Sequence, residues 1–169
     1  MLHSKGFFQV GFVVCDIREA MATWIGSGVG PFYFFPHIDV PNGYYRGQPQ
    51  KFDISAAVAQ AGALQIELIE HHGDGPSPYR DVYSVGQSGL HHMGAYAKDF
   101  DASILEFKQQ GLLPVFEGNY GARVAYFDTR STLGFMTEIL EPTETIVGIF
   151  KRVADEAVGW DGQDPIRRP

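Results

Sequence analysis

Cysteine is nearly absent from this sequence, which contains only Cys15. One cysteine cannot form a disulfide within the chain, so the core alone has to stabilise the fold. Cys15 closes an apolar stretch typical of a strand, where a free cysteine usually acts as a small buried hydrophobe. The first residues also lack the small-residue cleavage site of an export signal. Both observations favour a cytoplasmic protein.

Basic side chains and long uncharged runs are scarce as well. Lys and Arg number 13 against 20 Asp and Glu, for a formal net charge of -7, which argues against nucleic acid and anionic membrane surfaces as partners. The longest uncharged run, residues 20–38, is interrupted by several Gly and Pro residues, so it is not expected to span a bilayer. The remaining composition, 44% hydrophobic and 14% aromatic, suits a single domain over residues 1–169.

The chain contains an internal repeat. Segments 7–26 and 90–109 align without a gap, and in this alignment Gln9 corresponds to His92. Each segment is apolar at first and then changes to helical spacing, so each is expected to pass from a strand into a helix. The repeat therefore predicts two related modules in one chain.

Aspartates and glycines mark the ends of the two expected helices. Asp16 and Asp99 stand seven positions after Gln9 and His92, where a short carboxylate can cap the first turn of a helix. Gly26 and Gly111 follow at the places where the helical pattern ends.

Three strand-like segments separated by turn residues follow each expected helix. They are residues 31–40, 51–60 and 64–70 in the first half, and 112–118, 122–129 and 134–141 in the second. The pattern predicts module one at about 6–70, a polar linker at about 71–88, module two at about 89–142 and a C-terminal helix at about 143–160. Residues 41–49 are expected to form a long aromatic loop, and residues 161–169 a loose tail.

Histidines and glutamates occupy matching positions of the repeat. His91 and His92 are neighbours, and because neighbours in a strand point to opposite faces, only one of them is expected to face a concave sheet. The alignment with Gln9 favours His92. Glu67 and Glu138 stand at matching positions in final strands that are otherwise apolar. Burying a carboxylate costs free energy unless it is paired or binds a metal, so each of these two glutamates is expected to have such a partner.

These motifs resemble a known superfamily. The segments QVGFVVCDIREAM and HHMGAYAKDFDAS, which open the halves, and IELIE and TEILE, which close them, resemble the vicinal oxygen chelate superfamily of glyoxalases, bleomycin-resistance proteins and dioxygenases. The segment GVGPFYFF is similar to the branch near methylmalonyl-CoA epimerase. The resemblance implies an α+β fold in which two βαβββ modules form a cupped mixed sheet, followed by a C-terminal helix.

The resemblance also implies a metal site. In this superfamily the first and last strands of each module supply ligands, which here gives Gln9, Glu67, His92 and Glu138. The order Gln, Glu, His, Glu is similar to that of some glyoxalase I enzymes, whereas the epimerases more usually carry His first and Gln second. One imidazole nitrogen and three oxygens suit one divalent ion such as Zn²⁺, Ni²⁺, Co²⁺, Mn²⁺ or Fe²⁺.

The implied function is that of a metal-dependent isomerase, epimerase or lyase of the glyoxalase type. Such an enzyme removes a proton next to a carbonyl while the divalent metal stabilises the enolate oxygen. Glu138 is expected to be the main base, with Glu67 on the opposite face of a small-molecule substrate. The family also contains sites built from two chains, so a homodimer stays open.

Other interpretations stay open too. A resistance-type protein would bind a small molecule in the same cup without a metal. An extradiol dioxygenase would need two histidines on Fe²⁺, and Gln9 stands where the first is expected. Taken alone, His92 reads as an ordinary strand histidine. His37 is expected to be a half-exposed strand residue, with a substrate contact as the alternative, and His72 has no counterpart in the other half.

Overall fold

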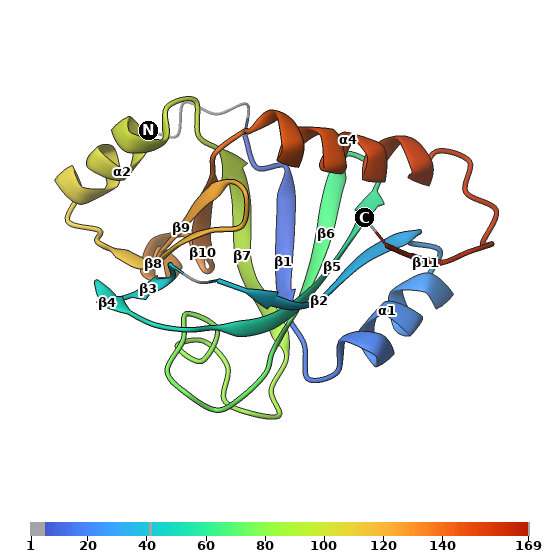
Figure 1. Ribbon diagram of the computed structural model, residues 1–169, viewed down its shortest axis with the longest axis horizontal. Helices are drawn as coiled ribbons and strands as arrows, with labels where there is room; N and C mark the ends of the chain where they lie inside the picture. The colour runs from blue at the N-terminus through green and yellow to red at the C-terminus, as the bar shows by residue number, and fades with distance from the viewer. Residues whose placement is uncertain (1–5, 41, 169) are drawn as a thin grey trace.

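A computed structural model describes residues 6–40 and 42–168, which form two similar series of strands and helices (Figure 1). The first half comprises β1 (Gln9–Val13), α1 (Ile17–Gly26), β2 (Phe32–Asp39), β3 (Tyr44–Tyr45), β4 (Gln48–Pro49), β5 (Asp53–Ala61) and β6 (Leu64–His71). The second half comprises β7 (Gly89–Tyr96), α2 (Phe100–Gln109), β8 (Pro114–Asn119), β9 (Arg123–Phe127), α3 (Arg130–Leu133) and β10 (Met136–Leu140). The C-terminal segment adds α4 (Glu144–Ala157) and β11 (Ile166–Arg167).

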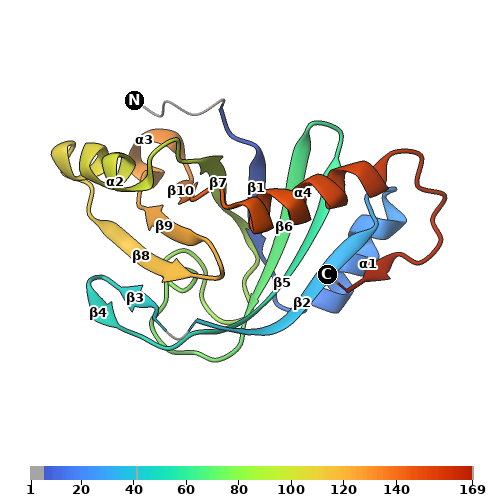
Figure 2. The same ribbon diagram turned by 45° about the horizontal axis from the view of Figure 1, so that its top comes forward.

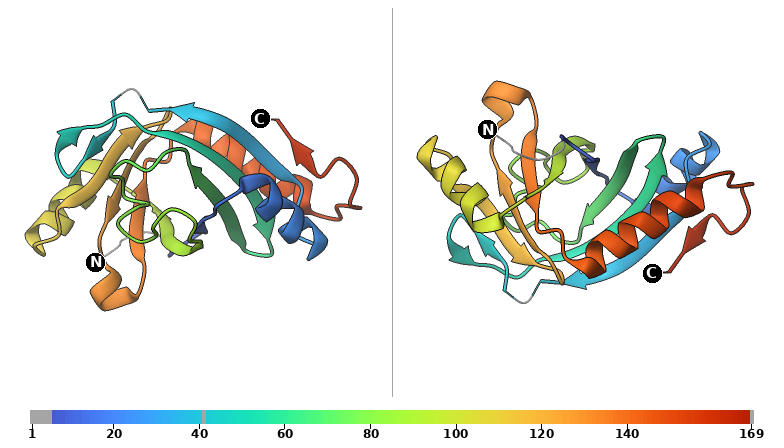
Figure 3. Two further views of the ribbon diagram at one scale, coloured as in Figure 1. Left: turned by 90° about the horizontal axis from the view of Figure 1, so that it is seen from below. Right: turned by 90° about the horizontal axis from the view of Figure 1, so that it is seen from above.

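The described strands belong to one mixed sheet with the order β11-β2-β5-β6-β1-β7-β10-β9-β8-β3-β4. The sheet is curved into an open cup, as Figure 3 shows from below and from above. Its centre consists of β6, β1, β7 and β10, which are the first and last strands of the two halves. The expected α+β fold with a cupped mixed sheet is confirmed.

The two halves meet where β1 and β7 pair in antiparallel orientation. On either side of this pair, β6 runs parallel to β1 and β10 runs parallel to β7. Alternate side chains of a strand face the same side of a sheet, so each of these four strands can direct side chains into the cup. The topology therefore gathers residues that are far apart in the sequence.

The aspartates predicted as helix caps adopt that role. The Asp16 carboxylate accepts hydrogen bonds from the backbone N–H groups of Arg18 and Glu19, at 2.8 and 2.9 Å, at the start of α1. Asp99 accepts from the N–H group of Ala102 at 3.0 Å at the start of α2. Each cap is worth about 1 kcal/mol. α1 ends at Gly26, and α2 ends two residues before Gly111, whose φ is +81°.

Apolar side chains pack on both faces of the sheet. On the convex face, α1 buries Ile17 and Met21 and α2 buries Ile104 and Phe107. On the concave face, the core includes Val13, Ile54, Ile69, Phe116, Tyr126 and Leu140. Among the described residues, no helix combines the length and the apolar character needed to cross a bilayer.

The C-terminal helix α4 lies on the concave side and packs against β5 (Figure 2). Thr143 caps it, accepting from the N–H group of Ile146 at 3.3 Å. Ile146 and Phe150 pack against the concave core. The helix therefore covers part of the cup.

Three local expectations differ from the structure. The loop expected at 41–49, of which Pro41 lies outside the described residues, contains the short hairpin of β3 and β4, and β3 pairs with β8. The tail expected to be loose contains β11, which pairs with β2 and is joined to α4 by an ion pair between Arg167 and Glu156. Cys15 is exposed, because it lies between the end of β1 and the cap of α1, and its sulfur is 3.1 Å from Ser88 Oγ.

Candidate metal centre

The four central strands bring together the four residues expected to form a site. Gln9 lies on β1, Glu67 on β6, His92 on β7 and Glu138 on β10. His92 Nε2 is 3.3 Å from Glu67 Oε2 and 3.6 Å from Glu138 Oε2. Ligands bound at about 2.0–2.2 Å to one ion lie about 3–3.5 Å from each other, so His92 is near ligand spacing from each carboxylate. Among the described residues, however, the ligand atoms of Glu67, His92 and Glu138 do not all lie within 4.8 Å of one another.

Each of the four residues presents an atom that is buried and has no hydrogen-bond partner within the described residues. These atoms are Gln9 Oε1, Glu67 Oε2, His92 Nε2 and Glu138 Oε2. The contact between His92 and Glu67 is short enough for an ion pair but lacks the alignment of a hydrogen bond. An unsatisfied buried polar group costs about 1–3 kcal/mol. A divalent cation that drew the carboxylates of Glu67 and Glu138 together would satisfy all four atoms.

His91 orients the ring of His92. Nε2 of His91 lies 3.1 Å from the carbonyl oxygen of Pro78 and therefore donates to it, which leaves Nδ1 of His91 as an acceptor. That atom is 3.1 Å from Nδ1 of His92, which donates to it. The lone pair of neutral His92 is thereby placed on Nε2, toward Glu67 and Glu138. Metal-binding histidines are commonly fixed in this way by a partner on the other ring nitrogen.

The expectation that only one of the two histidines points toward the concave side is wrong. The pairing of β1 with β7 shifts register between Gly11 and Phe12, and His91 is skipped by this bulge. A bulge interrupts the alternation of side chains along a strand. Both rings therefore pack against Tyr126, with centroid distances of 5.4 Å for His91 and 5.0 Å for His92. The adjacent histidines in the sequence were the only signal of this arrangement.

Gln9 is oriented by a neighbouring amide. Its Nε2 group donates to Oε1 of Gln65 at 2.7 Å, and both side chains are buried. This bond assigns the amide orientation and leaves Gln9 Oε1 directed at the site. Gln9 can therefore offer an oxygen to a cation, although an amide is a weaker ligand than a carboxylate.

Two glycines provide the space that the four side chains occupy. A Cβ atom at Gly11 would lie 2.0 Å from Cε1 of His92. A Cβ atom at Gly94 would lie 2.7 Å from Glu138 Oε2 and 2.8 Å from Gln9 Oε1. Any larger residue would displace the ligand atoms, so the glycines shared by both halves are a structural requirement of this site.

Burial and charge shift the pKa values within the site. Burial raises the pKa of Glu138 to about 7; His92 and Tyr126 oppose this rise, and Glu67 adds to it. Burial disfavours the charged form of His92, but the charges of Glu138 and Glu67 outweigh it and raise the pKa of His92. Burial lowers the pKa of His91 to about 3, which keeps that ring neutral. The metal-free site therefore retains a proton that a cation would displace.

A cavity of about 180 Å³ lies above these residues in the cup. Its polar lining includes Gln9, Glu67, Glu138 and the tyrosines Tyr79, Tyr120 and Tyr126. Its apolar lining comes from β2, β5 and β6, and from Ile146, Ile149 and Phe150 of α4. A larger groove of about 970 Å³ lies between α2 and α3 on the convex side of β10, and its lining contains none of the four candidate ligands.

Other histidines of interest lie outside this cup. His37 is not part of the cavity lining, and its side chain is 67% exposed, more than the half-exposed residue expected. His71 packs near Tyr79, and burial lowers its pKa to about 4. The loop around Tyr45 is joined to the linker, because the Tyr45 hydroxyl and Arg46 both bond to Asp81.

Comparisons with known proteins agree with this architecture. Residues 8–126 match the family described as the Glyoxalase/Bleomycin resistance protein/Dioxygenase superfamily. No curated protein matches the chain significantly. A similar solved structure is a hypothetical protein from Bacillus halodurans, with 24% identity, a TM-score of 0.58, and coverage of 82% of this chain and 95% of that one.

Two further similar structures are methylmalonyl-CoA epimerases. The enzyme from Mycobacterium tuberculosis has 17% identity and a TM-score of 0.56, over 86% of this chain and 93% of its own. A Streptomyces coelicolor variant in complex with 2-nitronate-propionyl-CoA has 14% identity and a TM-score of 0.58, over 83% and 96%. At these identities the likeness concerns the fold, whereas the family match covers most of the sequence. The chain belongs to the glyoxalase/bleomycin resistance protein/dioxygenase superfamily.

Proposed function

We propose that this protein is a metal-dependent isomerase, epimerase or lyase of the glyoxalase type, which removes a proton next to a carbonyl group. The observation that carries this proposal is the convergence of four buried ligand atoms, from Gln9, Glu67, His92 and Glu138, that lack hydrogen-bond partners among the described residues. A family of enzymes with this sheet also includes epimerases, which supports the same class of reaction.

The donor set fits a divalent ion of the first transition series. One imidazole and three side-chain oxygens suit Zn²⁺, Ni²⁺, Co²⁺, Mn²⁺ or Fe²⁺, and two carboxylates balance the charge of the ion. When bound, such an ion would supply Lewis-acid polarisation of a substrate oxygen. The site offers one histidine where an extradiol dioxygenase needs two, because both ring nitrogens of His91 are already bonded to Pro78 and His92.

Glu138 is the proposed base. Without a metal the pKa of Glu138 is about 7, and a bound cation would favour its deprotonated form, which is the form that a general base needs. Tyr126 contacts Glu138 and favours its charged form, so the pair can hold the base in position. Burial within the cup excludes bulk water from the proton that Glu138 holds.

Glu67 is the proposed partner of Glu138. The two carboxylates come from β6 and β10, which are separated in the sheet by β1 and β7. A substrate between them would present one face to each. One carboxylate can then remove a proton and the other can return it on the opposite face, which supports epimerisation or isomerisation.

The cup favours a compact apolar substrate. Its cavity of about 180 Å³ is smaller than the about 300–1,000 Å³ typical of pockets for drug-sized ligands. Ile146, Ile149 and Phe150 of α4 supply part of the apolar lining, and α4 lies beyond the family match, which ends at residue 126. We propose that α4 restricts the substrate to a small acyl or aromatic group at the reacting end.

Metal content and proton exchange test this proposal. Untagged protein purified without chelators is analysed by plasma mass spectrometry, together with His92→Ala, Glu138→Ala and the control Glu117→Ala, which changes a glutamate of β8 outside the cup. We expect the two site variants to lose one ion per chain that the wild type and the control retain. Enolisable carbonyl compounds are then screened for exchange with solvent deuterium.

The same experiment separates the rival function. Protein that contains no ion at these residues and takes up none on titration would overturn the metalloenzyme proposal. A metal-free binding protein would then be the better account, since the apolar cup would remain able to hold a small molecule. Metal without proton exchange in any carbonyl substrate would restrict the proposal to the metal centre.

A further inference from the structure

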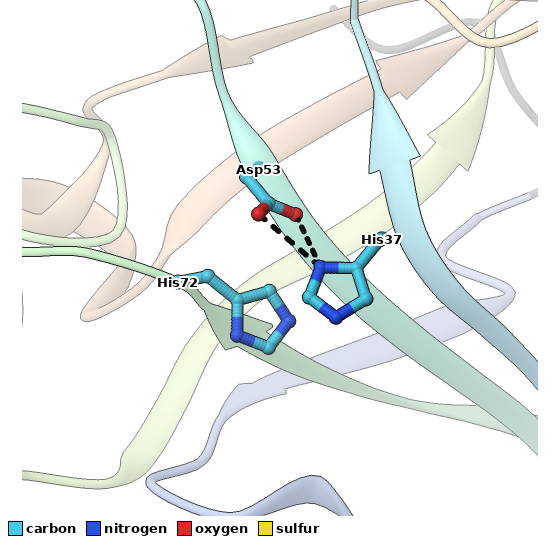
Figure 4. A group of neighbouring side chains, drawn as sticks. All are labelled: His37, Asp53 and His72. Carbon is cyan, nitrogen blue, oxygen red and sulfur yellow. Dashed lines mark hydrogen bonds and ion pairs between the residues drawn. The ribbon is translucent and has the colours of Figure 1, made fainter.

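Three side chains outside the cup form a second cluster of ligand atoms (Figure 4). His37 lies on β2, Asp53 on β5, and His72 directly follows β6. One ligand atom of each lies within 4.8 Å of the other two. His37 Nδ1 is 2.9 and 3.2 Å from the two oxygens of Asp53, and the rings of His37 and His72 stack with centroids 4.4 Å apart.

The backbone brings this cluster together from three segments. The pairing of β2 with β5 shifts register between Phe35 and Ile38, and within this irregularity His37 has a φ of +46°, an uncommon conformation for a residue other than glycine. The N–H group of His72 donates to the carbonyl oxygen of Asp53 at 2.9 Å. This bond and the pairing of β2 with β5 hold the two flanking segments against the central strand.

Ser55 contacts both histidines, the backbone of one and the ring of the other. Its buried hydroxyl oxygen accepts from the backbone N–H group of His37 at 3.1 Å and lies 2.7 Å from Nε2 of the His72 ring. Asp53 and Ser55 are two positions apart on β5, so they face the same side of the sheet. A single strand therefore supplies one ligand, Asp53, and a hydroxyl that contacts both of the residues that supply the others.

The cluster is separate from the candidate centre in the cup. Ile54, between Asp53 and Ser55, lines the cup, so Asp53 and Ser55 face the convex side. The side chains of His37 and Asp53 are 67% and 53% exposed, and that of His72 is 25% exposed. A cation can reach this cluster from solvent without entering the cup.

We propose that His37, Asp53 and His72 form a second divalent-metal site. Two imidazole nitrogens and one carboxylate prefer Zn²⁺, Ni²⁺ or Cu²⁺ over Mg²⁺ and Ca²⁺, which favour oxygen ligands. Ligands of one ion lie about 3–3.5 Å apart, and exposed side chains can close from 4.8 Å by small rotations. Coordination by Nε2 of His72 replaces its contact with Ser55, and water completes the coordination.

A metal at this site joins the irregular part of β2 to the end of β6. His72 begins the linker, whose Pro78 bonds to His91 and whose Tyr79 lines the cup. The outer site therefore acts as a structural clamp on the segment that supports the inner site. At Zn²⁺ concentrations about 100 times the dissociation constant, we expect the melting temperature to rise by about 5 °C.

Zinc titration of a variant without the inner ligands tests this site. The probe is Zn²⁺ added to untagged His92→Ala/Glu138→Ala protein, followed by calorimetry and competition with a chromophoric chelator. We expect one Zn²⁺ per chain to bind, and the further changes His37→Ala and His72→Ala each to weaken binding by more than about tenfold. His71→Ala is the matched control, because His71 packs toward Tyr79, and it should bind as before.

Ion selectivity and nuclear magnetic resonance complete the test. Mg²⁺ should leave the spectrum unchanged, whereas Zn²⁺ should shift the side-chain nitrogen signals of His37 and His72. If the double variant does not fold, the wild type is titrated instead, and its stoichiometry should fall from two to one on His37→Ala/His72→Ala. Absence of Zn²⁺ binding, or binding that survives the loss of both histidines, would overturn the outer site and leave the proposed function unaffected.

Discussion

The Nδ1 atoms of His91 and His92 lie 3.1 Å apart, within a bulge that turns both rings toward Tyr126. His91 bonds on its other side to the carbonyl oxygen of Pro78. These hydrogen bonds, from the linker through His91, fix the tautomer of His92, so a residue that is not itself a candidate ligand decides which nitrogen is available to a cation. This relay of hydrogen bonds suggests the first prediction.

Replacing His91 should weaken metal binding at the inner site without removing a ligand. We expect His91→Leu to lower the affinity for Zn²⁺ by about 10–100-fold, because His92 then loses the acceptor on Nδ1. His91→Asn retains an amide oxygen as an acceptor, so its affinity for Zn²⁺ should lie between those of the wild type and His91→Leu. Chelator competition gives the dissociation constants. Equal affinities of the wild type and His91→Leu would show that the relay does not act.

Adding one methyl group at Gly94 should abolish the inner site. Its Cβ atom would lie 2.7 Å from Glu138 Oε2, so Gly94→Ala must displace that ligand. Gly148→Ala is the matched control, because a Cβ atom there meets nothing within 4 Å on α4, and it should stabilise the helix by about 1 kcal/mol. Metal content and thermal unfolding are measured for both. Full metal occupancy in Gly94→Ala would contradict the geometry proposed for the ligands.

Raising the pH should destabilise the metal-free protein through Glu138. The pKa of this group is about 7 in the folded protein against 4.5 for the ordinary carboxyl, so the folded state binds the proton more tightly. The contribution of protonated Glu138 to the free energy of unfolding is fully present below the ordinary pKa and is lost as the pH rises through about 7. The loss is at most about 3 kcal/mol. Urea unfolding of wild type and Glu138→Gln after chelation, between about pH 5 and pH 8, measures the difference.

Zinc binding and the Glu138→Gln variant each check the origin of this pH dependence. Saturating Zn²⁺ should reverse the trend in the wild type, because the ion binds the deprotonated carboxylate. Glu138 titrates together with His92, whose pKa its charge raises, so a difference between wild type and Glu138→Gln that stays constant with pH would mean that this pair holds no extra proton in the folded state. Burial lowers the pKa of His91 to about 3, so this residue destabilises the fold as the pH falls below the ordinary pKa of histidine. His91 is present in both the wild type and Glu138→Gln.

Shortening Phe150 on α4 should open the cup. Phe150 lines the cavity and is partly buried, so Phe150→Ala should reduce the free energy of unfolding by about 2 kcal/mol and admit a larger apolar ligand. Val147 on the same helix is 39% exposed, and Val147→Ala should change stability by less than about 0.5 kcal/mol. Urea unfolding and the binding of an apolar fluorescent dye distinguish them. Equal effects of both variants would place α4 outside the cup in solution.

Much of the fold could be predicted from the sequence because its signals are local or repeated. Asp16 and Asp99 indicated two helix starts at equivalent positions, and both residues cap helices. The α+β class and the superfamily followed from the same repeat and are confirmed. The metal roles of Gln9, Glu67, His92 and Glu138, the division into modules, a homodimer and the cytoplasmic compartment stay predictions.

Other features could not be predicted, since they depend on pairing between distant strands. The bulge that skips His91 is a property of the register between β1 and β7. The pairing of β11 with β2 and of β3 with β8 likewise joins segments that no sequence pattern connects. His37 and His72 meet only because β5 lies between β2 and β6 in the sheet.

The sequence by itself determined which chemical groups this protein can use and in which strands they occur, because alternation, capping and repetition act over a few residues. The tertiary structure alone decided which atoms meet. It placed Glu67 Oε2 and Glu138 Oε2 within 3.6 Å of His92 Nε2, closed part of the cup with α4 and brought His37 to Asp53. Those contacts depend on sheet register and curvature, which arise only when the whole chain packs.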